Sequence, residues 1–204
     1  ISQLEHARVA AYLLEHVNDF QQLPLADQHI LKTACLHHDD GWRKWEAHPK
    51  TDPRTNFPLD FQCISCDDHI NIWKDSNAIA LKISPEVGFL VCQHSLYLSK
   101  LRFTNTENSA HHKAIQAFQT TIPHILTPRT PHLTTMQNLL KHADWLSLMI
   151  CMNKSTAQYN AYTLKKIKTH HYTSNISFIR HTLKISIQSY CHLTQQQQQK
   201  FIYL

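Results

Sequence analysis

The chain has 204 residues, of which 42% are hydrophobic, and this length and composition are typical of a globular protein with a sizeable core. Its net charge of +5 is spread along the chain and lacks the basic stripe with aromatic partners that nucleic-acid binding requires, so a small anionic substrate is the expected partner. The sequence contains no run of about 18 apolar residues, so no membrane span is predicted. No leader is recognisable either, and a cytoplasmic protein is expected.

Apolar residues recur at helical spacing along most of the chain. Ser84 and Pro85 mark a helix start, and Gly41 is expected to end an earlier helix in the left-handed conformation. Residues 42–61 are rich in Pro, Trp and charge and follow no period, so they predict a long irregular loop of functional importance. The chain after this loop is expected to become helical towards Lys82. The predicted helices cover residues 3–20, 27–40, 84–101, 107–121 and 133–153.

The period changes near the C-terminus. Ile176 and Phe178, and then residues 183–187, alternate at period two around a turn predicted at residues 173–175, which indicates antiparallel strands. The predicted fold class is therefore mainly α, with a helical domain of residues 1–155 and a small antiparallel β segment of residues 156–204 packed on it. The edge strands of that segment can pair with a second copy or be covered internally, so a homodimer is one of two expectations.

Of the six cysteines, Cys63 and Cys66 form a CxxC pair. A structural zinc site needs a second ligand pair, and a thioredoxin-like site needs a βαβ unit, and neither follows in the sequence. Both residues are therefore predicted to be free thiols.

Residues that bind metals occupy faces that should be buried. His6, His38 and His94 continue the apolar stripes of separate predicted helices, and Asp144 interrupts a fourth stripe. A buried aspartate is rare unless it is paired or bound to a metal. One shared metal ion, with Asp39 as a further ligand, would satisfy all of these groups, and nitrogen and oxygen ligands suit Fe, Mn, Ni, Co or Zn. The alternative is a set of core histidines beside a solvated acidic helix end.

The order His6, His38-Asp39, Asp144 resembles the H…HD…D signature of the HD-domain superfamily of metal-dependent phosphohydrolases. The nearer resemblance is to an uncharacterised bacterial branch marked by His-Asp-Asp-Gly-Trp. The resemblance covers residues 3–153, and its motifs here are residues 38–42, Pro58 to Phe61, His94 to Leu98 and Asp144 to Leu148.

This resemblance implies an HD-like helical bundle in which His6, His38, Asp39 and Asp144 hold one divalent metal ion. Members with a second ion add two histidines between the HD pair and the last Asp. The candidates here are His94, His69 and His111. The superfamily often has a basic residue soon after HD-x-G, where this chain has Trp42 and then Arg43, and the β segment is no part of the common core. Both departures leave the substrate open.

The implied chemistry is metal-assisted hydrolysis of a small phosphate ester or nucleotide. Asp39, with Asp40 beside it, would orient the attacking water, and His94 or His69 would bind phosphate or protonate the leaving oxygen. The predicted substrate contacts are Arg43, Lys44 and Trp42. Three alternatives remain open, namely a di-iron oxygenase built on the same ligands, a non-catalytic sensor of a small molecule, and a metal-free helical packing module.

Overall fold

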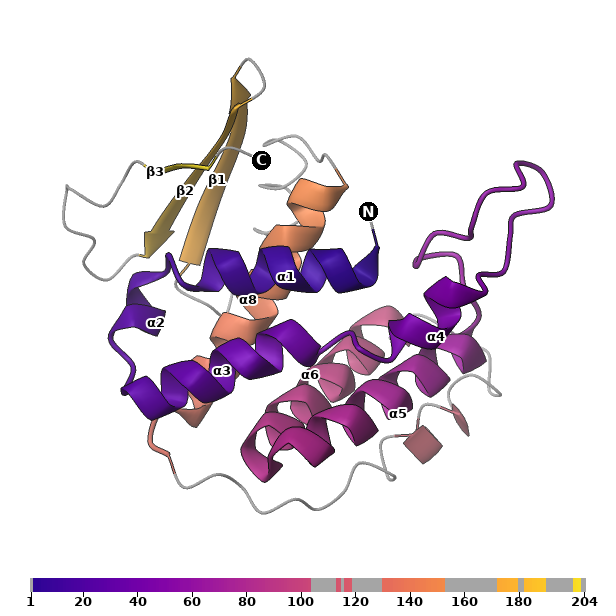
Figure 1. Cartoon of the computed structure of the whole chain (residues 1–204), viewed down its shortest axis with the longest axis horizontal. Coiled ribbons are helices and arrows are strands. Elements are labelled where there is room, and N and C mark those ends of the chain that lie inside the picture. Colours follow the sequence, from indigo (N-terminus) through magenta and orange to yellow (C-terminus); the bar gives the residue numbers. More distant parts are fainter. Residues whose placement is uncertain are drawn as a thin grey trace. The chain divides into compact units, whose positions relative to one another are not determined.

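A computed structural model describes residues 2–103, 113–114, 116–118 and 130–152, together with the backbone of residues 172–179, 182–189 and 200–202. The chain divides into two compact units, Ile1–Asp144 and Trp145–Leu204. The predicted domains of residues 1–155 and 156–204 stay a prediction. The helices are α1 (Gln3–Leu14), α2 (Asn18–Gln21), α3 (Leu25–His37), α4 (Trp42–Ala47), α5 (Cys66–Ile83), α6 (Pro85–Phe103) and α8 (Leu133–Cys151) (Figure 1). The predicted mainly α character is confirmed.

Serine side chains cap the first turns of three helices of the first unit. Ser2 accepts a hydrogen bond from the Glu5 amide in α1, and Ser65 accepts one from the Asp68 amide in α5, each at 3.1 Å. Ser84 caps α6 in the same way, with its hydroxyl 3.1 Å from the Val87 amide nitrogen, which confirms the predicted start. These caps satisfy amides that have no partner inside the helix.

Helices α5 and α6 form the longest helical hairpin of the first unit and run side by side (Figure 1). A buried hydrogen bond from the Ser95 hydroxyl to Asn77 Oδ1, 3.0 Å long, joins their middle turns. Helix α3 packs against both α1 and α6, so it lies between the N-terminal helix and the hairpin.

The beginning of α8 is tied to the beginning of α3. The Thr130 hydroxyl donates to Asp27 Oδ2 at 2.8 Å and accepts a bond from the His132 amide at 3.1 Å. This contact joins residues far apart in the sequence, and it anchors the helix that carries Asp144.

Several predicted boundaries are wrong. The helix predicted over residues 3–20 is divided, because α1 ends at Leu14 and α2 begins only at Asn18. The stretch predicted as irregular from residue 42 begins with α4, and the helix predicted to reach Asp40 ends at His37. The helix predicted over residues 107–121 lies largely outside the described residues. His111 and the Gln-rich tract 195–199 lie wholly outside them.

In the second unit, three antiparallel strands have the order β1-β2-β3, with bounds Tyr172–Ile179, Thr182–Ser189 and Lys200–Ile202. Ile176 lies opposite Ile185, and Phe178 lies opposite Leu183. The turn predicted at residues 173–175 is wrong, because these residues pair with β2 inside β1. The packing of the sheet on the helices stays a prediction. Among the described helices, none has the length and apolar character needed to cross a membrane.

Candidate metal centre

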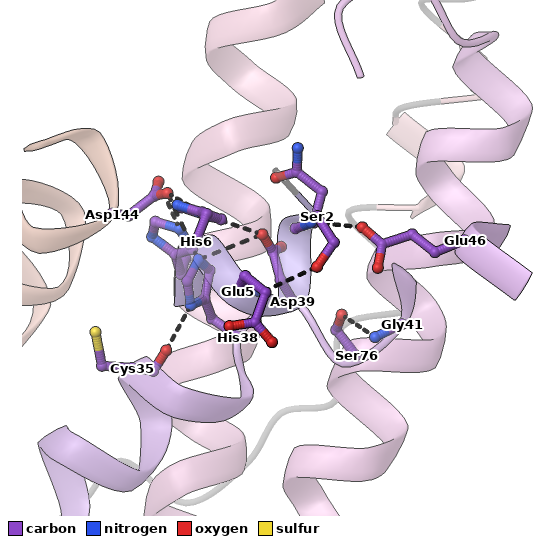
Figure 2. Close-up of polar contacts among 12 residues, drawn as sticks. Ser2, Glu5, His6, Cys35, His38, Asp39, Gly41, Glu46, Ser76 and Asp144 are labelled. Atoms are coloured by element: carbon purple, nitrogen blue, oxygen red, sulfur yellow. Dashed lines mark hydrogen bonds and ion pairs between the residues drawn. The ribbon is translucent and has the colours of Figure 1, made fainter. Parts of the chain in front are cut away.

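Five buried side chains from four parts of the first unit converge on one centre. His6 comes from α1, His38 and Asp39 from the turn after α3, His94 from α6 and Asp144 from α8. Each residue is between 1% and 6% exposed. Figure 2 shows His6, His38 and Asp39 beside Asp144. The structure therefore brings together His6, His38, Asp39 and Asp144 with His94, the further residue expected to share the ion.

The two carboxylates lie among the imidazoles. Asp144 Oδ1 is 3.3 Å from His6 Nε2 and 3.5 Å from His38 Nε2, and Asp144 Oδ2 is 3.1 Å from His94 Nε2. Asp39 Oδ2 is 3.0 Å from His6 Nε2 and 3.5 Å from His38 Nε2. Two overlapping groups result, one with Asp39 and one with Asp144, and within each group the possible ligand atoms lie within 4.8 Å of one another.

His38 is the residue common to both groups, and its ring orientation is fixed from outside the centre. Its Nδ1 lies 2.7 Å from the Cys35 carbonyl oxygen, which can only accept, so Nδ1 carries the hydrogen and Nε2 faces the carboxylates (Figure 2). The His6 and His94 rings each stand nearly perpendicular to the His38 ring, with ring centres 5.2 Å away. A backbone acceptor on the far nitrogen is the usual way in which a metal-binding histidine is oriented.

Polar atoms that lack hydrogen bonds give a direct test of whether a cation fits here. Nε2 of His38 and Nε2 of His94 are buried and lie 3.5 and 3.1 Å from Asp144 oxygens without hydrogen-bond geometry, and Nδ1 of His94 is buried without a hydrogen-bond partner. Buried polar atoms are otherwise almost always paired, because an unpaired one costs about 1–3 kcal/mol. A cation between the imidazoles and the carboxylates would satisfy Nε2 of both residues, so the donor set fits a metal ion.

The electrostatics describe a strongly coupled cluster. Burial acts to lower the pKa of His38, but the negative charges of Asp39 and Asp144 outweigh it and raise that pKa to about 9. Burial acts to raise the pKa values of Asp39 and Asp144, yet the neighbouring imidazoles hold both carboxyl pKa values below their usual range. Without a metal, a proton on His38 thus partly compensates the two carboxylates.

The neighbouring Asp40 points into a different environment. Its Oδ2 lies 2.7 Å from His37 Nδ1, and its Oδ1 accepts a bond of 3.1 Å from Arg43. Asp40 is therefore outside both groups, unlike Asp39. Arg43 and the exposed Lys44 are both engaged in ion pairs, Arg43 with Asp40 and Lys44 with Asp75 at 3.0 Å.

His69 and Trp42 form an aromatic stack next to the centre. The His69 ring stacks on Trp73 with ring centres 5.0 Å apart, and Trp42 meets it edge-on at 5.5 Å. Burial, with a smaller contribution from Arg102, lowers the pKa of His69 to about 3, so this imidazole is neutral. Trp42 itself is buried with Ile64 and Ile72, which is the environment of a packing residue.

Gly41 lies where the ligand-bearing turn packs against α5, and its backbone conformation differs from the predicted one. Its φ of −63° and ψ of −22° are right-handed, so the predicted left-handed helix end is wrong. A Cβ on Gly41 would lie 2.0 Å from the Ile72 carbonyl oxygen, and the Gly41 amide donates to Ser76 Oγ at 2.9 Å. Glycine is needed here for close approach.

Comparison with known proteins gives one match. A family profile described as "Protein of unknown function (DUF3891)" matches residues 1–200. The chain belongs to this family. No curated protein and no solved structure matches it. The matched region of this DUF3891 protein contains every residue of the candidate centre, and it also contains the free thiols Cys63 and Cys66, which are unpaired as predicted.

Sequence reasoning expected His94 to share the ion and also named it as a catalytic or second-ion candidate, and the structure groups His94 with His38 and Asp144. The feature that it missed is the Cys35 carbonyl, which no sequence signal reveals because any residue supplies a backbone oxygen. The apolar stripe around His94 was the signal that this histidine is buried.

Proposed function

We propose that this DUF3891 protein is a metal-dependent hydrolase that acts on a small phosphate ester or nucleotide. The observation that carries the proposal is the buried cluster of three histidines and two carboxylates, in which Nε2 of His38 and of His94 face Asp144 at 3.5 and 3.1 Å without hydrogen-bond geometry. The ordered resemblance of His6, His38-Asp39 and Asp144 to the HD-domain signature supports the same reaction class.

His6, His38, Asp39, His94 and Asp144 would hold the ion. A set of imidazole and carboxylate ligands without thiolate suits Fe, Mn, Ni, Co or Zn, as one ion or two. When bound, such an ion lowers the pKa of a coordinated water and neutralises charge on phosphoryl oxygens.

The chain's own residues have separable tasks in this proposal. The Cys35 carbonyl fixes the tautomer of His38, and the buried carboxylates of Asp39 and Asp144 orient the histidines that face them. Nδ1 of His94 is buried without a hydrogen-bond partner, so this ring nitrogen is the one that would contact a bound phosphate in this proposal. His69 is held neutral by burial, so in this proposal it would bind phosphate rather than protonate the leaving oxygen.

Asp39→Asn is expected to lose most of the bound metal and of the phosphate-ester hydrolysis, whereas Asp40→Asn is expected to keep both. The two positions are adjacent and the substitutions are isosteric, but only Asp39 belongs to the cluster. Elemental analysis of protein purified without chelator, together with hydrolysis of para-nitrophenyl phosphate and a nucleotide panel, makes the comparison. Equal metal content in the two variants would contradict the proposed site. Two irons per chain without hydrolysis would favour an oxygenase instead.

Metal affinity is expected to rise with pH. Because the pKa of His38 is raised to about 9 in the metal-free protein, an incoming ion must displace its proton. The Kd for Mn²⁺ or Co²⁺ should therefore fall about tenfold per pH unit between pH 6 and 8. Competition titrations at pH 6, 7 and 8 measure it, and a flat profile would show that His38 is not a ligand.

The stability of the metal-free protein is expected to change with pH in the opposite direction from the metal affinity. A raised pKa means that the contribution of His38 to stability is complete below the unfolded pKa of about 6.5 and is lost as the pH rises through about 9. In chelator, the free energy of unfolding should thus decline across this window, while the stabilisation by added metal grows. Denaturant titrations with and without metal separate the two trends.

A further inference from the structure

Lys141 lies one helical turn away from the candidate centre. Tyr97 follows His94 by three residues on α6, and Lys141 precedes Asp144 by three residues on α8, so each lies on the same helix face as a ligand. The His94 and Tyr97 ring centres are 6.3 Å apart, and Lys141 Nζ lies 4.7 Å from the centre of the Tyr97 ring. The contact between His94 and Asp144 is therefore continued by a contact between Tyr97 and Lys141.

Lys100 follows Tyr97 by three residues on α6, so it lies on the same helix face as the ring that Lys141 contacts. Burial, and after it the charge of Lys100, lowers the pKa of the half-buried Lys141. Neither lysine forms an ion pair with a carboxylate of the described residues. By contrast, Lys32, Lys44 and Lys50 each have such a partner. Two like charges held together without a counter-ion raise the free energy of the protein, and a bound anion would reverse that cost.

The charge balance of the centre shows why further positive charge is needed to bind a phosphoryl group there. The carboxylates of Asp39 and Asp144 already cancel the two charges of one divalent ion. A phosphoryl group brings about two further negative charges near neutral pH. The predicted substrate cations Arg43 and Lys44 are already paired with Asp40 and Asp75, so they supply no free positive charge.

We infer that Lys141 and Lys100 bind phosphoryl oxygens of the substrate, with Tyr97 holding the Lys141 side chain in place. This inference deepens the proposed function and rests on it for the identity of the anion as substrate. It assigns substrate recognition to α6 and α8 rather than to the residues after the His-Asp-Asp-Gly turn. Lysine is suited to such a role as a mobile point charge.

The test uses inorganic phosphate as the probe and calorimetric titration as the readout, on metal-loaded and metal-free full-length protein. Lys141→Met keeps the apolar stem and removes the charge, and Lys100→Met does the same at the second position. Lys82→Met is the matched control, because Lys82 is exposed in the last turn of α5 and has no ion pair among the described residues. We expect phosphate affinity to fall about tenfold in Lys141→Met and less in Lys100→Met, with no change in Lys82→Met.

Metal content, measured on the same samples, separates this inference from the proposed function. Metal content equal to wild type with weakened phosphate binding in Lys141→Met supports both. Loss of phosphate binding in Lys141→Met from a protein that takes up no metal supports the lysine site and contradicts the metal-dependent function. Equal phosphate affinity in all variants, or no phosphate binding by wild type, overturns the lysine site whatever the metal content.

Discussion

Asp144→Asn is expected to abolish metal binding and to lower the free energy of unfolding of the metal-free protein by about 3–5 kcal/mol. Asp144 is the carboxylate shared by the largest number of imidazoles, with oxygens 3.1–3.5 Å from His6, His38 and His94. Removing its charge leaves a buried imidazolium at His38 with only Asp39 to compensate it. The same change should lower the pKa of His38, because Asp144 is one of the groups that raise it.

The matched control is Asp75→Asn, which removes a carboxylate from an exposed ion pair with Lys44. Exposed pairs of this kind contribute about 0–1 kcal/mol, so stability and metal content should stay near wild type. Elemental analysis reports the metal, and denaturant unfolding in chelator reports the stability. If Asp144→Asn keeps a full complement of metal, the centre does not include this residue. A loss of stability in a protein that binds no metal as wild type either would instead describe a metal-free polar core.

The helices and the ligand positions were predictable to different degrees. Apolar periodicity and the Ser84-Pro85 start predicted α6, and the stripe through Met136 and Leu140 predicted α8, because both helices bury one face over many turns. The six residues of α4 are too few to show a period. The break between α1 and α2 depends on local backbone hydrogen bonds that periodicity does not register.

The residues of the candidate site were also only partly predictable from the sequence. His6, His38, Asp39 and Asp144 were found because polar residues on apolar faces need partners, and the structure brings all of them together. The sequence predicted only Asp39 as a ligand but gave Asp40 a catalytic role beside it, whereas Asp40 lies outside both groups of possible ligands. Consecutive carboxylates after a helix end point in directions set by the turn, and here the Trp42 amide donates to the Asp39 carbonyl at 3.0 Å in a tight turn. Lys141 was missed because its partner Tyr97 lies on another helix.

The conformation of Gly41 is a clear case of a tertiary cause that sequence could not supply. A glycine at a helix end usually indicates a left-handed residue. Here the backbone is right-handed, and a glycine is required because α5 packs so close that a Cβ would not fit. The close approach brings the His38-Asp39 turn onto the hairpin that also carries His94, so the geometry of the centre depends on a missing side chain.

Gly41→Ala is accordingly expected to destabilise the protein by about 3 kcal/mol or more and to weaken metal binding at the same time. The added methyl would meet the Ile72 carbonyl oxygen at 2.0 Å and the Ser76 amide nitrogen at 2.8 Å, and both are backbone atoms of α5 that cannot turn aside. The turn must therefore move away from α5, which displaces His38 and Asp39 from the remaining ligands. Denaturant unfolding and a metal titration measure the two consequences.

Two further variants grade this effect. Ser76→Ala keeps the space but leaves the buried Gly41 amide without its acceptor, so a loss of about 1–3 kcal/mol is expected. Lys44→Ala, at an exposed position of α4, should change stability by no more than about 0.5 kcal/mol. The order Gly41→Ala, Ser76→Ala, Lys44→Ala in decreasing cost follows from steric overlap, a lost hydrogen bond and a surface change. If Gly41→Ala cost no more than Lys44→Ala, close approach to α5 would not be what holds the ligand-bearing turn in place.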